Sequence, residues 1–151
     1  MSGTIKILLA EEHTMVRDAM AQYLAKEQDF VVLEPCGNAV EAIVVAQQDA
    51  PQVALISVFL PGQDAFETAA TIQAICPGAC VIFLTTQATD EQIARALETR
   101  ARGILKKQDS LSELPAAIRE AAGGGTYFSE EIRRRLIIDS EGVRLAGTDD
   151  E

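Results

Sequence analysis

Acidic, hydroxyl and amine side chains stand at the ends of four apolar runs in this 151-residue chain. They are Glu11 and Glu12 after the first run, Ser57 at the end of the third, Thr85 at the end of the fourth and Lys107 after the fifth. Carboxylates are ligands that Mg²⁺ accepts, and an ammonium pairs with phosphate oxygens. One such residue alone is weak evidence, because every loop carries polar groups. The ordered series predicts one shared site.

The apolar runs alternate with segments of helical periodicity, which predicts a (βα)5 order and a parallel sheet wound by right-handed crossovers. The predicted strands are Ile5–Ala10, Phe30–Leu33, Val53–Ser57, Val81–Thr85 and Gly103–Lys106. The predicted helices are Thr14–Ala25, Asn38–Gln48, Asp64–Ile75, Asp90–Thr99 and Leu111–Ala122. In such a sheet, ligands bind outside the carboxyl ends of the strands, so the polar residues above should converge there.

Each predicted helix has a residue suited to cap its N-terminus. These residues are Thr14, Asn38, Asp64, Asp90 and Ser110. Pro115 would lie deep in the last helix if Ser110 were its cap, and capping from Ser112 would resolve this by shortening the helix. Gly123, Gly124 and Gly125 are expected to end that helix.

Four short strings resemble the receiver domain of bacterial response regulators of the NarL/FixJ/LuxR type. Leu8 to His13 resembles its Leu-Leu-Ala-Asp-Asp-His start, and Leu60 to Asp64 resembles its Met-Pro-Gly-Met-Asp loop. Gly103 to Lys107 resembles its Gly-Tyr-Leu-Leu-Lys ending, and Ala117 to Ser129 resembles its last helix and the link beyond. The resemblance covers roughly residues 5–136. It implies a flavodoxin-like α/β fold with a five-stranded parallel sheet in the order 2-1-3-4-5, two helices on one face and three on the other.

The resemblance also implies a role for each polar residue. Glu11 and Glu12 would hold Mg²⁺ together with a phosphate-accepting aspartate and the backbone carbonyl of Phe59. Thr85 and Lys107 would contact phosphoryl oxygens. Phosphorylation would then shift a loop and a helix between two arrangements.

Three residues depart from this pattern. Ser57 stands where the accepting aspartate is expected, and a neutral hydroxyl cannot form an acyl phosphate. Glu12 replaces a shorter aspartate at the metal position, and Ile104 replaces the aromatic residue that acts as a switch. The sequence therefore predicts a degenerate receiver with weak or absent Mg²⁺ binding and no other cofactor, in which Lys107 pairs directly with Glu11 or Glu12.

Other chemistry at Ser57 is less well supported. Its neighbours Ile56 and Val58 do not form a Gly-x-Ser-x-Gly elbow, and the one histidine, His13, lies in a different loop. A serine hydrolase is thus a distant alternative, phosphorylation by a serine kinase is sterically awkward, and no catalytic residue is predicted. His13 is expected to be a loop or capping residue.

The composition limits the partners. The net charge of −10 argues against a nucleic-acid grip by this chain, because phosphate contacts need Lys and Arg. The Arg133–Arg135 run is expected to be a solvated helix face. Cys36, Cys76 and Cys80 suggest buried reduced thiols rather than a zinc site. The N-terminal residues lack a signal-peptide pattern and no apolar run would span a membrane, which predicts a cytoplasmic protein without membrane contact.

Two parts are expected, a receiver domain at residues 1–125 and a short helix with an interdomain linker or tail at 126–151. The helix is predicted at Ser129–Leu136, and Ile137–Glu151 shows no clear periodicity. A DNA-binding helix-turn-helix domain is absent from this chain, so any contact with DNA would be made elsewhere.

The leading interpretation is a phosphorylation-independent regulatory and dimerisation module of a LuxR/NarL-type transcriptional regulator, and not an enzyme. The alternative is a free-standing adaptor that binds a signalling protein such as a histidine kinase. Receivers of this type pair through helices one and five, or through the face of helix four, strand five and helix five. The apolar candidates for such contacts are Ile93, Leu97, Ile104, Leu114 and Ile118, which could equally serve the core.

Overall fold

The strands of the fold are built from runs of Ile, Val, Leu and Phe, as expected for strands that helices cover on both faces. The computed structural model describes residues 3–108 and 111–146. The strands are β1 (Ile5–Ala10), β2 (Phe30–Val32), β3 (Val53–Ser57), β4 (Cys80–Thr85), β5 (Gly103–Lys106), β6 (Tyr127–Phe128), β7 (Leu136–Asp139) and β8 (Gly142–Leu145). The first five match the predicted strands to within one residue at each end.

The helices begin close to the predicted positions. They are α1 (Thr14–Ala25), α2 (Ala39–Asp49), α3 (Ala65–Ile75), α4 (Asp90–Glu98), α5 (Glu113–Ala122) and α6 (Glu130–Arg133). Asn38 and Asp64 cap α2 and α3 as predicted, since each side chain accepts backbone N–H bonds from the first turn.

Two predicted caps are wrong. Thr14 and Asp90 are already helical, and the cap positions belong to His13 and Thr89, whose backbones are extended. The predicted cap Ser110 lies outside the described residues. The shorter α5 starts after Ser112, which places Pro115 in the first turn, where its missing N–H has no intrahelical partner to lose.

The main sheet has the order β2-β1-β3-β4-β5-β6, and every pair in it is parallel. The predicted order 2-1-3-4-5 is therefore confirmed, and the sheet has one strand more than predicted. The added strand β6 pairs Tyr127 with Gly103 and Phe128 with Ile104. It follows Gly124, which takes a left-handed φ of 97° after the end of α5.

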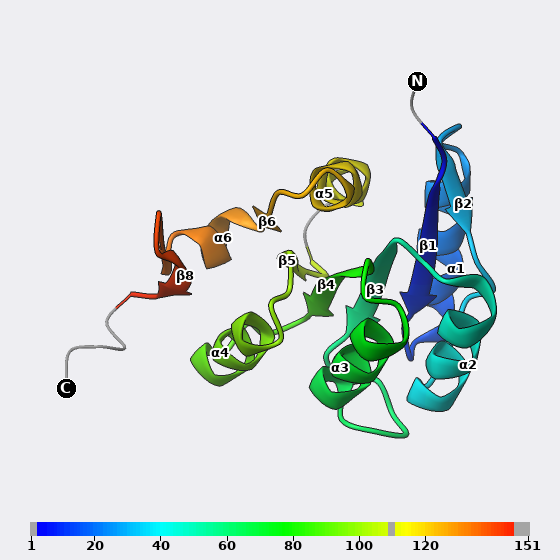
Figure 1. The fold of residues 1–151 in the computed structure, drawn as a ribbon, viewed down its shortest axis with the longest axis horizontal. Coiled ribbons are helices and arrows are strands. Elements are labelled where there is room, and N and C mark those ends of the chain that lie inside the picture. The colour runs from blue at the N-terminus through cyan, green and yellow to red at the C-terminus, as the bar shows by residue number, and fades with distance from the viewer. Residues whose placement is uncertain (1–2, 109–110, 147–151) are drawn as a thin grey trace.

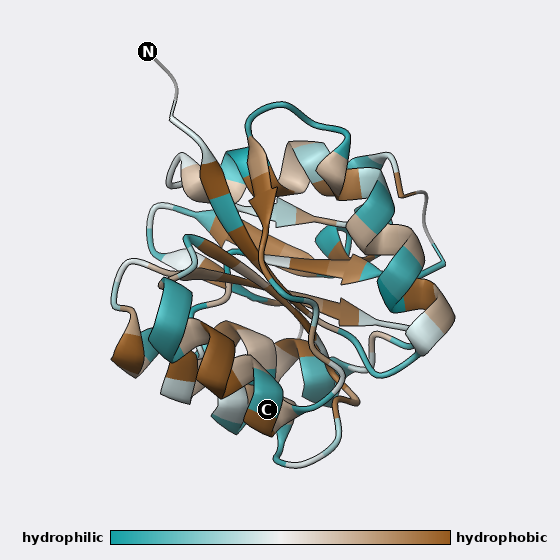
Figure 2. Ribbon diagram, turned by 90° about the vertical axis from the view of Figure 1, so that its right-hand side faces the viewer, coloured by the Kyte–Doolittle hydropathy of each residue, from teal (hydrophilic) through white to brown (hydrophobic). Residues whose placement is uncertain are grey.

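Helices cover both faces of the sheet, three on one side and two on the other. Figure 1 shows α2, α3 and α4 side by side below the sheet and α5 above it. One apolar core joins the sheet to α2, α3 and α4, and a second joins it to α1 and α5. Figure 2 shows the apolar strands between the two helical layers. In the described part of the chain, no helix is long and apolar enough to cross a membrane.

The segment after β6 differs from the prediction. The expected helix Ser129–Leu136 is only the four-residue α6, and the expected irregular tail contains the antiparallel hairpin β7–β8. Arg135 was expected on a solvated helix face, but it donates to the carbonyl of Ala88 at 2.6 Å. The prediction failed because this segment gains its structure by packing on α4 and β5 and has little local periodicity of its own.

Candidate functional site

The polar residues predicted from the sequence do converge, because four parallel strands end at the same edge of the sheet. The register places Ser57 beside Leu84 and Thr85 beside Lys106. β1 ends directly before Glu11 and β5 directly before Lys107, so both loops open on this edge.

Lys107 forms the centre of the site as an ammonium between two carboxylates. Its Nζ lies 2.9 Å from Glu11 Oε1, 3.1 Å from Glu11 Oε2 and 3.4 Å from Glu12 Oε2. The Lys107 side chain is 8% exposed, and those of Glu11 and Glu12 are 0% and 18% exposed. The predicted lysine–acid pair is therefore confirmed, and the pair is buried.

Two further side chains, His13 and Arg17, which sequence reasoning did not place in the site, lie against the Glu11 residue. The imidazole Nδ1 of His13 lies 3.1 Å from Glu11 Oε2, and the His13 backbone N–H donates to the same oxygen at 3.0 Å. The Arg17 guanidinium donates to the Glu11 carbonyl at 2.8 Å. The position of His13 directly after the acidic pair was a usable signal that it belongs to the site. Arg17 gave no such signal, because it lies in α1 and reaches the loop only through the folded geometry of that helix.

Opposing influences act on the pKa of Glu12. Burial raises it, and the Ser57 hydroxyl, the Glu12 backbone, Lys107 and His13 lower it by more. The pKa of the Glu12 carboxyl therefore lies below its usual value of 4.5, and Glu12 is ionised at neutral pH. The site thus carries a negative charge on Glu12 that the neighbouring Lys107 ammonium helps to balance.

Ser57 is fully buried at the end of β3. Its hydroxyl lies close enough to Glu12 to lower that carboxyl's pKa, but it has no well-aligned hydrogen bond to any described residue. A side chain without exposure cannot reach an external substrate. This geometry gives no support to Ser57 as a nucleophile.

The hydroxyl of Thr85 is engaged by the segment that leads into α4. Thr85 is 1% exposed, and its Oγ1 lies 2.8 Å from the Gln87 carbonyl oxygen and 2.8 Å from Gln92 Oε1, either of which can accept its one hydrogen. The backbone of Lys107 donates to the Thr85 carbonyl at 2.8 Å. Thr85 therefore links the end of β4 to both α4 and the lysine loop.

Two predicted positions remain, Phe59 in the loop after β3 and Ile104 within β5. Phe59 follows β3 by two residues, and its side chain is 56% exposed. Ile104 is buried in β5 and lies opposite Phe128 of β6. An aromatic ring is thus present beside the predicted switch position, but it comes from the neighbouring strand.

The donor set fits Mg²⁺ poorly. Glu11, Glu12 and His13 offer ligand atoms within 4.8 Å of one another, but the Lys107 ammonium already contacts both carboxylates. A divalent ion would have to displace that ammonium, and Ser57 would add only a neutral oxygen. Mg²⁺ prefers carboxylate and water oxygens in near-ideal octahedral geometry.

Several known proteins are similar to this chain. The family described as the response regulator receiver domain matches residues 7–119. The response regulator protein VraR of Staphylococcus aureus is 28% identical over 129 residues, which are 85% of this chain and 62% of VraR. The chain thus spans under two thirds of that relative's length.

Two solved structures show the same fold. A LuxR-family two-component response regulator from Aurantimonas superposes with a TM-score of 0.81 at 23% identity, covering 87% of this chain and 94% of the other. The isolated receiver domain of RcsB from Salmonella enterica gives a TM-score of 0.80 at 19% identity, covering 87% and 98%.

The doubly wound sheet with acids, hydroxyls and a lysine at its strand ends defines a flavodoxin-like α/β signalling domain. The family match covers well over half of the chain. The chain belongs to the response regulator receiver domain family.

Proposed function

We propose that this chain is a degenerate receiver that regulates without a phosphorylation cycle. The observation that carries the proposal is the buried ion pair at the strand ends. Lys107 Nζ lies 2.9 Å from Glu11 and 3.4 Å from Glu12, beside the fully buried Ser57. An internal ammonium thereby occupies the place beside the two carboxylates that a metal ion would otherwise take, and Ser57 supplies no carboxylate to accept phosphate.

The proposed context is a LuxR/NarL-type transcriptional regulator, in which this domain serves regulation and homodimerisation. Support comes from the VraR relative and from the LuxR-family structure. A histidine kinase or another signalling protein would be the partner that delivers the signal. Contact with DNA would be made by a domain outside these 151 residues, since the net charge of −10 opposes it here.

A catalytic role is not part of the proposal. Ser57 has no exposed surface, and the His13 imidazole is paired with Glu11. A hydrolase needs a nucleophile within hydrogen-bond reach of its base and open to substrate.

The test is a titration of the 151-residue chain with Mg²⁺ and beryllofluoride, a phosphoryl mimic, followed by amide NMR shifts and sedimentation velocity. We expect no saturable shifts around Glu11, Glu12, Thr85 and Lys107 and no change of association state. The Ser57→Asp variant is the matched control, because it restores a third carboxylate and should gain a saturable response to both ions. Saturable shifts in the unmodified chain at those four residues would overturn the proposal.

A further inference from the structure

The outer edge of β5 is covered by a later part of its own chain. β6 lies along β5 in parallel, with Tyr127 beside Gly103. The approach is close enough that a Cβ at Gly103 would lie 2.4 Å from the Tyr127 carbonyl oxygen, so only glycine fits there. An open strand edge is a template for pairing with another chain, and β6 removes this template.

Polar contacts made directly after β6 fasten the segment to β5. The Ser129 hydroxyl accepts the Lys106 backbone N–H at 3.0 Å, and the Ser129 N–H donates to the Ile104 carbonyl at 3.0 Å. The Lys106 ammonium pairs with Glu131 at 2.5 Å. These bonds fix the register of the segment on β5.

Three apolar side chains bury the segment in the core of the domain. Phe128, Ile132 and Leu145 are 7%, 0% and 6% exposed and belong to the core that includes α4. β8 lies against α4, where Ala94 and Leu97 share a hollow of about 340 Å³ with it. The flank of α4 that carries Ala94 and Leu97 is thus partly covered by the hairpin.

Arg135 ties the segment to the first turn of α4. It donates to the Ala88 carbonyl at 2.6 Å and also pairs with Asp90. Thr85 holds the same turn from the sheet side through Gln92. The start of α4 is therefore held from two directions, once from the site and once from the C-terminal segment.

We propose that residues 126–146, the strap, are a built-in occupant of the face formed by α4 and β5. The strap fixes the start of α4 and keeps a second copy of this chain from docking on that face. Without the strap, the β5 edge and the Ala94–Leu97 flank would be open together. A second copy of this chain could then dock there, because its own β5 edge can pair with the open β5 edge of the first copy beside the apolar flank of α4.

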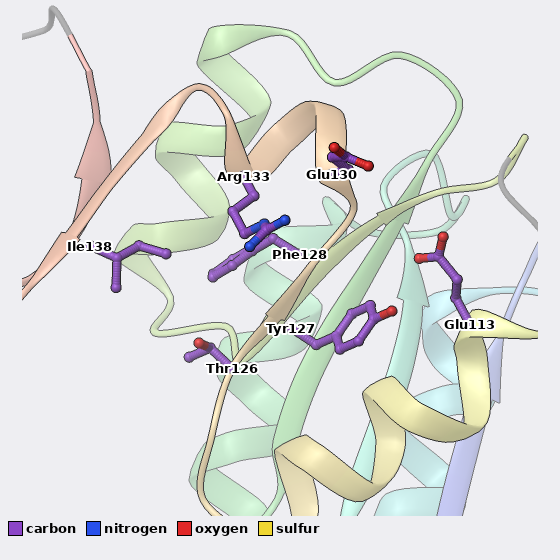
Figure 3. Close-up of a pocket in the computed structure, with 7 residues that line it drawn as sticks. All are labelled: Glu113, Thr126, Tyr127, Phe128, Glu130, Arg133 and Ile138. Carbon is purple, nitrogen blue, oxygen red and sulfur yellow. The ribbon is translucent and has the colours of Figure 1, made fainter.

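The strap also borders a hollow that it shares with α5. The hollow has a volume of about 430 Å³. It is lined by strap residues Thr126, Tyr127, Phe128, Glu130, Arg133 and Ile138 together with Glu113 of α5, whose side chains Figure 3 draws. Figure 1 shows the strap running from α5 past β5 toward α4. The proposal depends on these contacts alone and holds whether or not the site at Lys107 binds a phosphoryl mimic.

The experiment uses the full 151-residue chain and two matched pairs of variants. Arg135→Ala cuts the tie to α4, and its control Arg134→Ala removes the preceding arginine, which is 75% exposed and pairs with Glu130 of α6. Gly103→Ala pushes β6 away, and its control Gly78→Ala adds a methyl group that meets nothing within 4 Å. Far-UV circular dichroism verifies that each variant is folded.

Hydrogen exchange of peptides from residues 86–98 and 127–146 and sedimentation velocity provide the two readouts. We expect Arg135→Ala to speed exchange in residues 86–98 by about tenfold, because bonds to a charged donor are lost. Gly103→Ala should speed exchange in both segments and add one concentration-dependent association step. Both controls should match the unmodified chain. Unchanged exchange in both test variants would overturn the strap, and released variants that gain no association step would overturn its role in blocking a second copy.

Discussion

Removing the ammonium of Lys107 should destabilise the domain far more than removing the ammonium of Lys106. At an effective dielectric constant of about 20, unit charges attract by about 6 kcal/mol at the 2.9 Å distance to Glu11 and by about 5 kcal/mol at the 3.4 Å distance to Glu12. Desolvation offsets much of this attraction. Breaking a buried pair by removing one partner still costs about 3–5 kcal/mol, because the other charge stays buried.

We therefore expect Lys107→Met to lower the free energy of unfolding by about 3–5 kcal/mol, out of the roughly 5–15 kcal/mol of a typical domain. At about 2–4 °C per kcal/mol, the Tm should fall by about 6–20 °C. The assay is urea unfolding followed by circular dichroism at pH 7, with the slope compared between variants.

Lys106→Met is the matched control, because the Lys106–Glu131 pair lies near the surface, with side chains 23% and 55% exposed. Its expected cost is about 0–1 kcal/mol. Glu11→Gln combined with Lys107→Met should recover part of the loss, since it removes one of the two unbalanced charges. Equal losses in the two lysine variants would refute the reasoning that burial makes the Lys107 pair different.

The pH dependence has a defined sign. Burial raises the pKa of Glu12, but the Ser57 hydroxyl and the nearby cations lower it further, so the native pKa lies below 4.5. The native carboxyl thus binds a proton less tightly than the unfolded one. Its contribution to stability is present above about pH 4.5 and is lost as the pH falls through the native pKa. The stability difference between the unmodified chain and Lys107→Met should therefore shrink below that pH.

Three further outcomes are expected. Ser57→Ala should lower the unfolding free energy at pH 7 by about 0.5–1.5 kcal/mol, because it removes the hydroxyl that lowers the pKa of Glu12; an unchanged free energy would show that the hydroxyl does not support the Glu12 carboxylate. Asp64→Ala should cost about 1–2 kcal/mol by removing the α3 cap, while Asp64→Asn, which keeps the cap oxygen, should cost less than half of that in the same urea assay. Burial raises the pKa of the Cys36 thiol to about 11, so iodoacetamide at pH 8 should modify the partly exposed Cys80 first, as read by mass spectrometry, with the difference abolished in urea.

The sequence was sufficient for those parts of the fold whose signals are local. β1, β3, β5 and α1 begin and end where their apolar patterns do. The pairing of Lys107 with the acids could also be predicted, because the carboxyl ends of parallel strands lie at the same edge of a sheet whatever the conformation of the loops. His13 was underestimated, since only the turn of the loop after β1 brings its ring onto Glu11.

The strap was missed for a physical reason. β6 is two residues long and exists through its pairing with β5, and a lone hairpin such as β7–β8 is marginal without packing partners. The turn at Asp139 to Gly142 between two apolar stretches was nevertheless a hairpin signal, and Gly142 takes the φ of 124° that the turn requires.

The last two residues of the β5 region link the two halves of the molecule. Lys107 pairs with Glu11 in the site, whereas Lys106 pairs with Glu131 in the strap. The two lysine charges at the carboxyl end of β5 are thus both balanced by acidic residues of the same chain. A receiver that responds to phosphate needs this region to have two arrangements of similar energy. Here both lysines are paired in one arrangement. Under the function proposed above, a signal would come from a partner that competes with Glu131 and its neighbours for the β5 edge.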